Sequence, residues 1–155
     1  MNPGIFREYD IRGIAGEDIN EDDVVLIGRA YGTMLRNQDR RTVSVGRDCR
    51  TTSERFAALF IEGITATGCD VIDIGLCPTP VLYFSIQNLN LDGGAMVTAS
   101  HNPPEYNGFK LMSGLDSIHG SGLQDVLKII ETRQFATGDG RVTQKDIISP
   151  YMDYV

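Results

Sequence analysis

Residues 41–74 read RTVSVGRDCRTTSERFAALFIEGITATGCDVIDI, and this stretch decides the fold class. Its beginning, Arg41–Val45, is short and rich in β-branched residues, which is typical of a strand. The segment Thr51–Glu54 has the capping-box pattern of a helix start, and apolar residues follow it at helical spacing. Its end, Asp70–Ile74, again has the pattern of a strand. The stretch predicts a strand, a helix and a strand, which is the repeating unit of a parallel sheet.

The same alternation continues on both sides of this stretch. Before it, Asn20 is suited to cap an amphipathic helix that runs from about residue 21 to residue 36. After it, Thr79 and Pro80 have the pattern of a helix start, so we expect a helix over 81–87. The remaining expected elements are strands at 94–98 and 108–112 and a helix opened by a second capping box at Ser121–Gln124.

The two expected strands at 94–98 and 108–112 lie close together in the sequence. The interval between them is too short for a helical crossover, so we expect these two strands to be antiparallel. The other strands are separated by helices and are expected to be parallel. The sequence thus predicts an α/β fold: a three-layer α/β/α domain with a mixed, mainly parallel sheet.

Composition narrows the functional class. The length of 155 residues suits one domain, and 41% apolar with 23% charged residues is ordinary for a globular protein. The formal net charge of −7 argues against the broad basic surface of a nucleic-acid-binding protein. No apolar run is long enough for a membrane span, and the first residues lack the features of a signal peptide. Neither a nucleic-acid partner nor a membrane partner is expected.

The three cysteines, at positions 49, 69 and 77, bear on the cellular compartment. Their number is odd and no two of them form a C-x-x-C pair, so neither a disulfide framework nor a zinc site is expected. We expect a protein of the reducing cytoplasm.

The segment Thr98–Lys110, TASHNPPEYNGFK, holds the most informative residues. It follows an expected strand, and loops beyond the carboxyl ends of α/β strands are where ligands usually bind. Pro103 and Pro104 stiffen the turn, so we expect Ser100 to be exposed on it. The residue types alone leave two interpretations equally open. Ser100 is either a functional serine or the cap of a tight hairpin turn.

Two other functions fit parts of this pattern. A serine hydrolase pairs a serine with a histidine, as Ser100 and His101 are paired here, but the loop lacks the G-x-S-x-G nucleophile elbow. Adjacent residues also rarely reach the geometry of a catalytic triad, which disfavours the hydrolase. A phosphosugar-binding module without catalysis is the second alternative.

Three motifs together resemble the α-D-phosphohexomutase superfamily. The loop core, Thr98–Pro103, is similar to the T-[AG]-S-H-N-P phosphoserine motif of that family. Phe6–Gly13, FREYDIRG, resembles the F-R-x-Y-D-I-R-G opening of its phosphomannomutase/phosphoglucomutase branch, and Val45–Arg50 contains its G-x-D-x-R turn. The motifs occur in the order of the family, and the resemblance covers essentially the whole chain. It favours the mannose/glucose branch over the phosphoglucosamine branch.

The resemblance implies an enzyme that interconverts hexose 1-phosphate and hexose 6-phosphate, with mannose or glucose as the sugar. Ser100 would carry a phosphoryl group, give it to the substrate to form a bisphosphorylated sugar, and take the other phosphate back. A phosphate oxygen on Ser100 would bind Mg²⁺, which prefers oxygen ligands, together with carboxylates of a second domain. The expected partners are therefore a hexose phosphate and the remaining domains of the same polypeptide.

The resemblance also implies roles for five further residues. Lys110 would supply positive charge to the transferring phosphate, although an outward-facing strand lysine requires no such role. His101 is either a proton shuttle or phosphate contact, or an orienting hydrogen-bond partner within the turn. Arg12 and Tyr9 match substrate contacts of the family. Asn102 is also assigned to the substrate site, where shaping the loop is its simpler role.

The turn that contains Asp48 and Arg50 is expected to support the loop through an ion pair between them rather than to take part in catalysis. The metal loop of the family, D-G-D-x-D-R, is not found in the sequence. Its nearest look-alike, Gly138–Arg141, has a single carboxylate and is predicted to be a turn.

Residues 1–149 are interpreted as the phosphoserine-carrying first domain. A break at Ile148–Pro150 is expected to separate it from 150–155, the start of a linker or second domain. Because most of the cleft would belong to other domains, these residues alone are expected to have no mutase activity.

Overall fold

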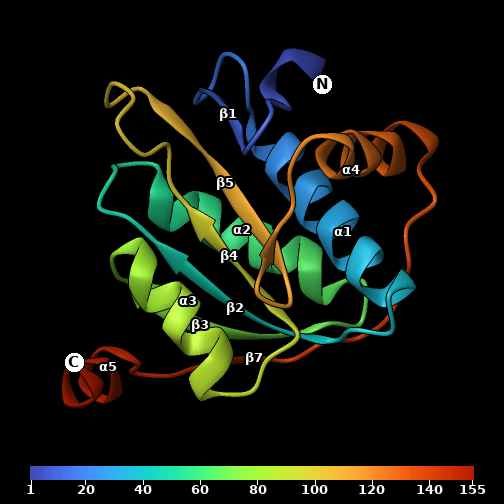
Figure 1. Ribbon diagram of the computed structural model, residues 1–155. Helices are drawn as coiled ribbons and strands as arrows, with labels where there is room; N and C mark the ends of the chain where they lie inside the picture. Colours follow the sequence, from blue (N-terminus) through green and yellow to red (C-terminus); the bar gives the residue numbers. More distant parts are fainter.

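A seven-stranded sheet forms the centre of the molecule and carries helices on both faces (Figure 1). The computed structural model describes all residues from 1 to 155. The strands are β1 (Ile11–Ile14), β2 (Thr42–Arg47), β3 (Asp70–Leu76), β4 (Gly93–Val97), β5 (Tyr106–Ser113), β6 (Asp116–Ser117) and β7 (Val142–Gln144). The helices are α1 (Glu21–Asn37), α2 (Ser53–Thr65), α3 (Thr79–Asn88), α4 (Ser121–Thr132) and α5 (Ile148–Tyr154), with a short 3-10 helix at Pro3–Ile5.

The strands follow the order β1-β5-β4-β2-β3-β7, and β6 pairs with β5 outside this path. Three strand pairs are parallel: β2 with β3, β2 with β4, and β3 with β7. In contrast, β5 is antiparallel to each strand it pairs with, β1, β4 and β6. The predicted antiparallel pair and the predicted mixed sheet are both confirmed.

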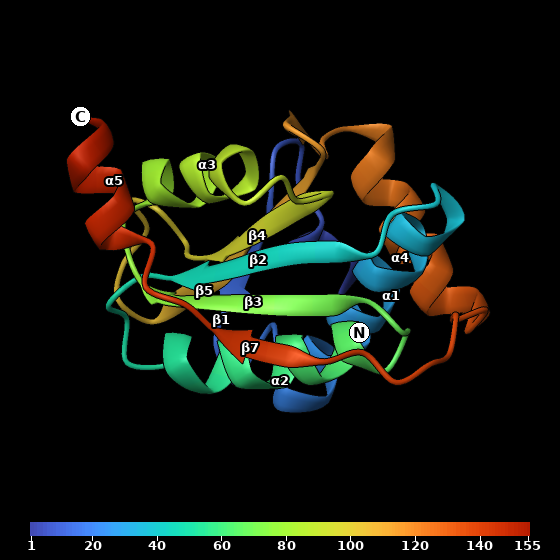
Figure 2. The same cartoon turned by 90° about the horizontal axis from the view of Figure 1, so that it is seen from below.

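Helices cover both faces of the sheet, which makes three layers as predicted. On one face α3 packs over β2 and β4, with α5 beside it, while α1 and α2 cover the other face and α4 lies against α1 (Figure 2). The larger core, 29 buried residues, lies on the side of α1, α2 and α4, and a smaller core of six lies beneath α3. The loops that leave the carboxyl ends of β2 and β4 meet at one end of this sheet.

Helices α1 and α2 touch directly because each has a glycine where they cross. A Cβ on Gly28 would lie 2.3 Å from the carbonyl oxygen of Phe60, and a Cβ on Gly63 would lie 2.2 Å from that of Val25. Real Cβ atoms do not come this close to backbone atoms. The contact fixes the position of α2, whose first turn contributes side chains to the site described below.

The helix starts show where sequence and structure differ. The predicted cap of α1 is confirmed, because Asn20 accepts the backbone N–H of Asp23 and the Asp23 carboxylate accepts that of Asn20. Both predicted capping boxes are wrong. Thr52 rather than Thr51 precedes α2 and makes no side-chain cap, and Gly120 precedes α4.

The physical reasons differ between these helices. At α2 the helix begins at Ser53, one residue later than a cap at Thr51 requires, and the hydroxyl groups of Thr52 and Ser53 bind other side chains, as described below. At α4 the chain turns at Gly120 with a φ of 53°, so Ser121 is already the first helical residue. Likewise, Thr79 is the first residue of α3 and not its cap, because Pro78 holds the extended conformation before the helix.

The carboxyl-terminal part contains two elements that the pattern did not predict. Gly138–Arg141 is not a turn but an extended segment that leads into β7. Its backbone lies close to that of the segment before β3, since a Cβ on Gly140 would lie 1.8 Å from the carbonyl oxygen of Cys69. The expected break at Ile148–Pro150 is the first turn of α5. Pro150 fits there because first-turn N–H groups have no acceptor within the helix. The domain boundary near residue 149 stays a prediction.

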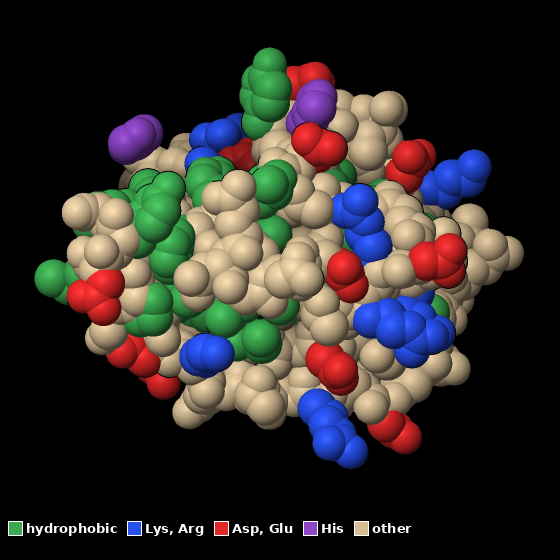
Figure 3. Space-filling view, turned by 60° about the horizontal axis from the view of Figure 1, so that its bottom comes forward, with side chains coloured by type: hydrophobic (Ala, Val, Ile, Leu, Met, Phe, Trp, Pro, Cys, Tyr) green, Lys and Arg blue, Asp and Glu red, His purple; other side chains and the backbone are tan.

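Hydrophobic side chains gather on the side of the surface toward α3 and α5, whereas charged side chains of both signs are scattered, most of them over the rest of the face shown (Figure 3). In α3, the ring of Phe84 contacts those of Tyr151 and Tyr154 in α5, and Tyr154 remains 75% exposed. None of the helices combines the length and the apolar character needed to cross a membrane.

Candidate active site

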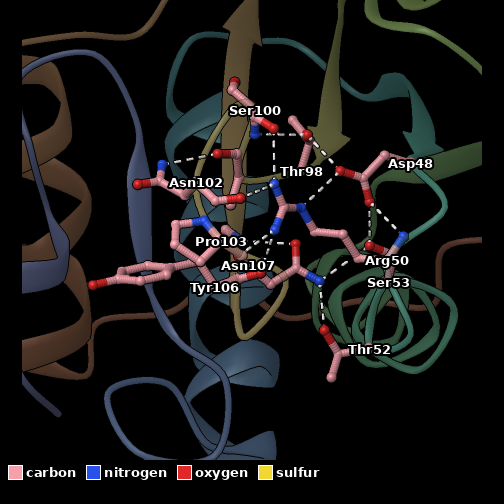
Figure 4. Close-up of polar contacts among 12 residues, drawn as sticks. Asp48, Arg50, Thr52, Ser53, Thr98, Ser100, Asn102, Pro103, Tyr106 and Asn107 are labelled. Atoms are coloured by element: carbon pink, nitrogen blue, oxygen red, sulfur yellow. Dashed lines mark hydrogen bonds and ion pairs between the residues drawn. The ribbon is translucent and has the colours of Figure 1, made fainter.

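Ser100 lies in the Ser100 loop, residues 98–105, which joins β4 to β5, and it is exposed (Figure 4). Its φ of 54° is in the left-handed region, which costs a residue with a Cβ about 1–2 kcal/mol. The other non-glycine residues with positive φ each follow the end of a helix, where this conformation is common: Asp39, Asn90 and Arg133. Ser100 alone has it in a loop after a strand, so neighbouring groups must stabilise it.

Asp48, just beyond β2, supports the Ser100 loop through Thr98. The Thr98 hydroxyl donates to Asp48 Oδ2 at 2.6 Å, and its oxygen accepts the N–H of Ser100 at 3.0 Å. Asp48 Oδ1 accepts the Ser53 hydroxyl and the N–H of Arg50. Burial alone would raise the pKa of Asp48, but these hydrogen bonds and the charge of Arg50 outweigh it and lower the pKa. Asp48 is therefore ionised at neutral pH.

Arg50 binds the same loop from its other side (Figure 4). Its Nε donates to Asp48 Oδ2 at 3.2 Å, which confirms the predicted ion pair. Its two terminal nitrogens donate, over 2.7 to 3.1 Å, to the carbonyl oxygens of Ser100, Asn102, Pro103 and Tyr106. A guanidinium has five N–H groups, so every donor of Arg50 is used within the chain.

Asn107, fully buried in β5, connects that strand to the start of α2. Its Nδ2 donates to Thr52 Oγ1 at 2.8 Å and to Ser53 Oγ at 3.0 Å. Since Ser53 donates in turn to Asp48, a continuous chain of hydrogen bonds runs from β5 through α2 to the Ser100 loop. These bonds involve the hydroxyl groups of Thr52 and Ser53, which lie between the two capping residues, Thr51 and Glu54, that the sequence pattern predicted.

A hollow of about 530 Å³ opens beside Ser100 at the carboxyl ends of β2 and β4. Its lining residues are Asp48, Cys49, Arg50, Thr51, Thr98, Ser100, Asn102 and Pro104. The volume is in the range of small-molecule sites, and α/β sheets usually bind their ligands at this end.

Arg12 and Lys110 leave the same face of the sheet on neighbouring strands. Arg12 of β1 is opposite Gly108 of β5, and Lys110 comes two residues later on β5. Lys110 makes no ion pair or side-chain hydrogen bond within the chain, and Arg12 uses only Nε, which donates to Asp10 Oδ1 at 3.0 Å. Both cations keep N–H groups that are free to bind an anion.

The remaining residues singled out by the motifs are placed differently. His101 is exposed on the Ser100 loop, and no hydrogen bond fixes its ring. Asn102 Nδ2 donates to the carbonyl oxygen of Ala99 at 2.9 Å and so shapes the turn. Tyr9 is 70% exposed and stacks on His119, with 6.3 Å between ring centroids. Tyr9 makes no hydrogen bond or ring contact with the Ser100 loop.

Three further residues belong to the site although no sequence pattern assigned them to it: Thr98, Ser53 and Asn107. Each is polar and buried, and each makes a hydrogen bond that the loop depends on. All three lie within or next to the motifs, so proximity was an available signal. The burial of these polar side chains was not a signal that the sequence offered, because it arises only when three distant segments come together.

Comparison with known proteins agrees with this geometry. The family described as phosphoglucomutase/phosphomannomutase, alpha/beta/alpha domain I, matches residues 3–136. The chain belongs to this family. The predicted resemblance to the phosphomannomutase/phosphoglucomutase branch of the phosphohexomutases is thereby confirmed.

Individual relatives of this domain I family support the assignment. A phosphoglucomutase/phosphomannomutase of Thermococcus kodakarensis is 40% identical over 97% of this chain and 35% of its own length. A phosphomannomutase/phosphoglucomutase of Pseudomonas aeruginosa is 38% identical over 97% of this chain and 33% of its own length. The crystal structure of a family protein from Burkholderia thailandensis has a TM-score of 0.92 at 38% identity and covers 96% of this chain and 34% of that one. The chain spans about a third of the length of the curated relatives it matches.

Proposed function

We propose that these residues form the first domain of a phosphohexomutase in which Ser100 carries the phosphoryl group. The observation that supports this best is the exposed Ser100, held in a left-handed conformation beside a hollow in a member of the domain I family. Backbone strain of this kind persists where the surrounding structure maintains it, and it concentrates at functional sites. A plain hairpin turn would place glycine or asparagine at this position.

The reaction would move phosphate between the C1 and C6 oxygens of a hexose. Phosphorylated Ser100 gives its phosphoryl group to the free hydroxyl of a hexose monophosphate: the bond from phosphorus to Ser100 Oγ breaks as the bond to the sugar oxygen forms. The hydroxyl proton leaves at this step, and His101, which is exposed next to Ser100, would accept it in this proposal. After the bisphosphorylated sugar turns over, a bond forms from Ser100 Oγ to the phosphorus of the other phosphate as the bond from that phosphorus to its sugar oxygen breaks. The proton returns to this sugar oxygen, which becomes the free hydroxyl of the product. No phosphate is consumed, and the product is the positional isomer.

Free cations are needed because charge accumulates on the transferring phosphoryl oxygens. Lys110 and Arg12 fit this role, since both retain free N–H groups on one face of the sheet. Tyr9 and Asn102 are the further substrate contacts in this proposal. The Asn102 side chain binds within its own turn and the Tyr9 ring stacks on His119, so their part would be to shape and border the site.

The phosphoserine would also bind Mg²⁺. Phosphorylated Ser100 would present phosphate oxygens at an exposed position, which suits an ion that prefers oxygen ligands. Asp48 cannot serve as a ligand without losing its partners, because four hydrogen bonds fill its two carboxylate oxygens. The chain has no cluster of three or more metal-ligating side chains, so the other ligands would be carboxylates of a second domain. The bound cation would neutralise phosphate charge during transfer.

The whole enzyme in this proposal extends beyond these residues. Residues 1–149 would be domain I and 150–155 the start of the next domain, with the remaining domains and a mannose or glucose phosphate as partners. The isolated 155 residues would have no mutase activity, because they hold only part of the cleft. The three free cysteines, two of them buried, are compatible with a reducing cytoplasm.

Mass spectrometry of the complete polypeptide tests the proposal. After incubation with a hexose 1,6-bisphosphate, Ser100 should carry one phosphoryl group, and the protein should interconvert the 1- and 6-phosphates of mannose or glucose. Binding of hexose phosphate without turnover or phosphoserine would contradict the proposal and favour a binding module. The same assay with glucosamine 1-phosphate separates the two branches of the family.

A further inference from the structure

The backbone N–H and the carbonyl oxygen of Ser100 are both connected by hydrogen bonds to one ion pair, Asp48–Arg50. The carbonyl oxygen accepts Arg50 Nη2 at 2.7 Å, and the N–H donates to the Thr98 hydroxyl, which donates to Asp48. Asp48 and Arg50 are bonded to each other at 3.2 Å, which closes a ring of interactions around Ser100. The two peptide planes that flank Ser100 are thus both held, and these planes set its φ and ψ.

On this basis, and resting on the function proposed above, we propose that Arg50 and Asp48, acting through Thr98, are positioning residues for phosphoryl transfer. Together these three residues form the loop clamp. It holds Ser100 in the left-handed conformation that directs its oxygen toward the substrate, and it contacts neither substrate nor phosphate itself.

The number of N–H groups left without a partner distinguishes Arg50 of the loop clamp from the cations proposed to bind substrate. All five N–H groups of Arg50 are used within the chain, so none is free for a phosphate. By contrast, the terminal nitrogens of Arg12 and the ammonium of Lys110 have no partner in the chain. Similar cations of one domain therefore serve two purposes, positioning for Arg50 and anion binding for the other two.

Arginine is required for this task because of its shape. Its planar fork directs donors at four carbonyl oxygens and at Asp48 simultaneously. A lysine would keep the charge but has three donors at one point, so it could hold only part of the loop. The Thr98 hydroxyl is equally specific, since it accepts from Ser100 and donates to Asp48, which neither a methyl group nor a hydrogen atom can do.

Kinetics of the complete polypeptide test the loop clamp with two matched pairs of variants. Arg50→Lys is paired with Arg55→Lys, because Arg55 also binds a carboxylate, Glu21, but both side chains are more than half exposed. Thr98→Val, which keeps the shape and loses the hydroxyl, is paired with Thr98→Ser, which keeps the hydroxyl. We expect Arg50→Lys and Thr98→Val to lower kcat about 100-fold with KM for the hexose phosphate within about twofold. Arg55→Lys and Thr98→Ser should retain wild-type kcat.

A spectroscopic signature separates positioning from stability. The phosphorus-31 NMR resonance of phosphorylated Ser100 should shift or broaden in Arg50→Lys and Thr98→Val and stay unchanged in the two controls, at a temperature where all four variants are folded. If Arg50→Lys does not fold, the comparison of Thr98→Val with Thr98→Ser decides the question alone.

Other outcomes overturn the inference in distinguishable ways. A raised KM with unchanged kcat would show that the loop clamp binds substrate, and wild-type kinetics in both test variants would show that it has no role in transfer. In either case Ser100→Ala should still be inactive. If Ser100→Ala keeps normal turnover, the proposed function itself is wrong.

Discussion

Two networks of a carboxylate and an arginine join the same pair of strands, β2 and β4, at opposite ends. At the carboxyl ends, Asp48 follows β2 and donates its N–H to the carbonyl oxygen of Val97 in β4 at 3.1 Å. At the amino ends, Asp92 precedes β4, and its carboxylate accepts the N–H groups of Arg41 and Thr42 beside β2 at 2.8 and 3.2 Å. Both networks contain a carboxylate that binds backbone N–H groups and an arginine that binds carbonyl oxygens, although only Asp48 and Arg50 form an ion pair.

The networks differ in the residue on which they end. In the amino-end network, Arg40 Nη1 donates to Ser113 Oγ at 2.9 Å and to the carbonyl oxygen of Asp92 at 3.3 Å, and neither acceptor has a positive φ. The loop clamp instead ends on Ser100, which is exposed and left-handed. If Ser100 carries the phosphoryl group as proposed, the strain and exposure of a network's last residue distinguish a network that positions a reactive group from one that only stabilises the fold.

The first way to test this contrast is to remove a serine from each network. Ser100→Ala should abolish mutase activity of the complete polypeptide, by on the order of 10³-fold or more, because the phosphoryl acceptor is lost. Steady-state turnover of hexose 1-phosphate measures this effect.

Ser113→Ala is the matched control. It removes a hydroxyl that binds Arg40 and Gln38 in the amino-end network and should leave kcat within about twofold. Equal losses in the two variants would contradict the distinction between the networks.

The second test exchanges each carboxylate for an amide. Asp48→Asn and Asp92→Asn should each lower the free energy of unfolding by about 1–3 kcal/mol, because each loses hydrogen bonds to a charged acceptor. Only Asp48→Asn should also lower kcat per folded molecule, by roughly 10- to 100-fold, since Ser100 is released from its geometry. Urea unfolding and turnover at a temperature where both variants are folded measure the two effects. A similar loss of kcat in Asp92→Asn would remove the contrast.

Local sequence patterns predicted the framework of the fold for physical reasons, whereas the prediction of Ser100 as the centre of the candidate site came from the resemblance of three motifs to a family. Local patterns set the helices and strands around residues 41–74, and the short interval before β5 fixed the antiparallel pair. The elements that the sequence missed depend on distant contacts: β7 forms only by pairing with β3, and the first turn of α2 is decided by Asn107, far along the chain.

The same limit applies to the site. The Asp48–Arg50 ion pair could be predicted because its residues are two positions apart. That Arg50 reaches three carbonyl oxygens of the Ser100 loop, and a fourth at Tyr106 in β5, could not be predicted, since some fifty residues separate these segments from Arg50 in the sequence. The left-handed φ of Ser100 was also hidden, because no residue type in the loop requires it.

The third test compares the stability of the same two variants at neutral and acidic pH. The pKa values of Asp48 and Asp92 both lie below their usual range: burial alone would raise them, but hydrogen bonds and a nearby arginine, Arg50 or Arg40, outweigh it. A carboxylate with a lowered pKa stabilises the fold above its unfolded pKa of about 4, and the contribution is lost as the pH falls through its folded pKa. The destabilisation caused by Asp48→Asn or Asp92→Asn should therefore be smaller at pH 3 than at pH 7.

Urea unfolding of the wild type and both variants at the two pH values measures this difference. Because the acid response depends on the carboxylate and not on what the network holds, both ends of the sheet should behave alike. A destabilisation that is equal at both pH values, or larger at pH 3, would mean that these carboxylates do not carry the predicted linkage.

The smallest expected effect concerns the strain itself. Ser100→Gly should raise the free energy of unfolding by about 0.5–1 kcal/mol. Glycine adopts a positive φ without the Cβ penalty, and the entropy that this more flexible residue loses on folding offsets part of the gain. Asn90→Gly, at the end of α3 with a φ of 53°, is the control and should change stability less, because asparagine tolerates this conformation. Chemical unfolding of both variants measures the difference. A gain at position 100 that exceeds the gain at position 90 would mean that the domain retains an unfavourable conformation at Ser100, the phosphoryl carrier of the proposed function. Equal changes would mean that the loop clamp holds no strain.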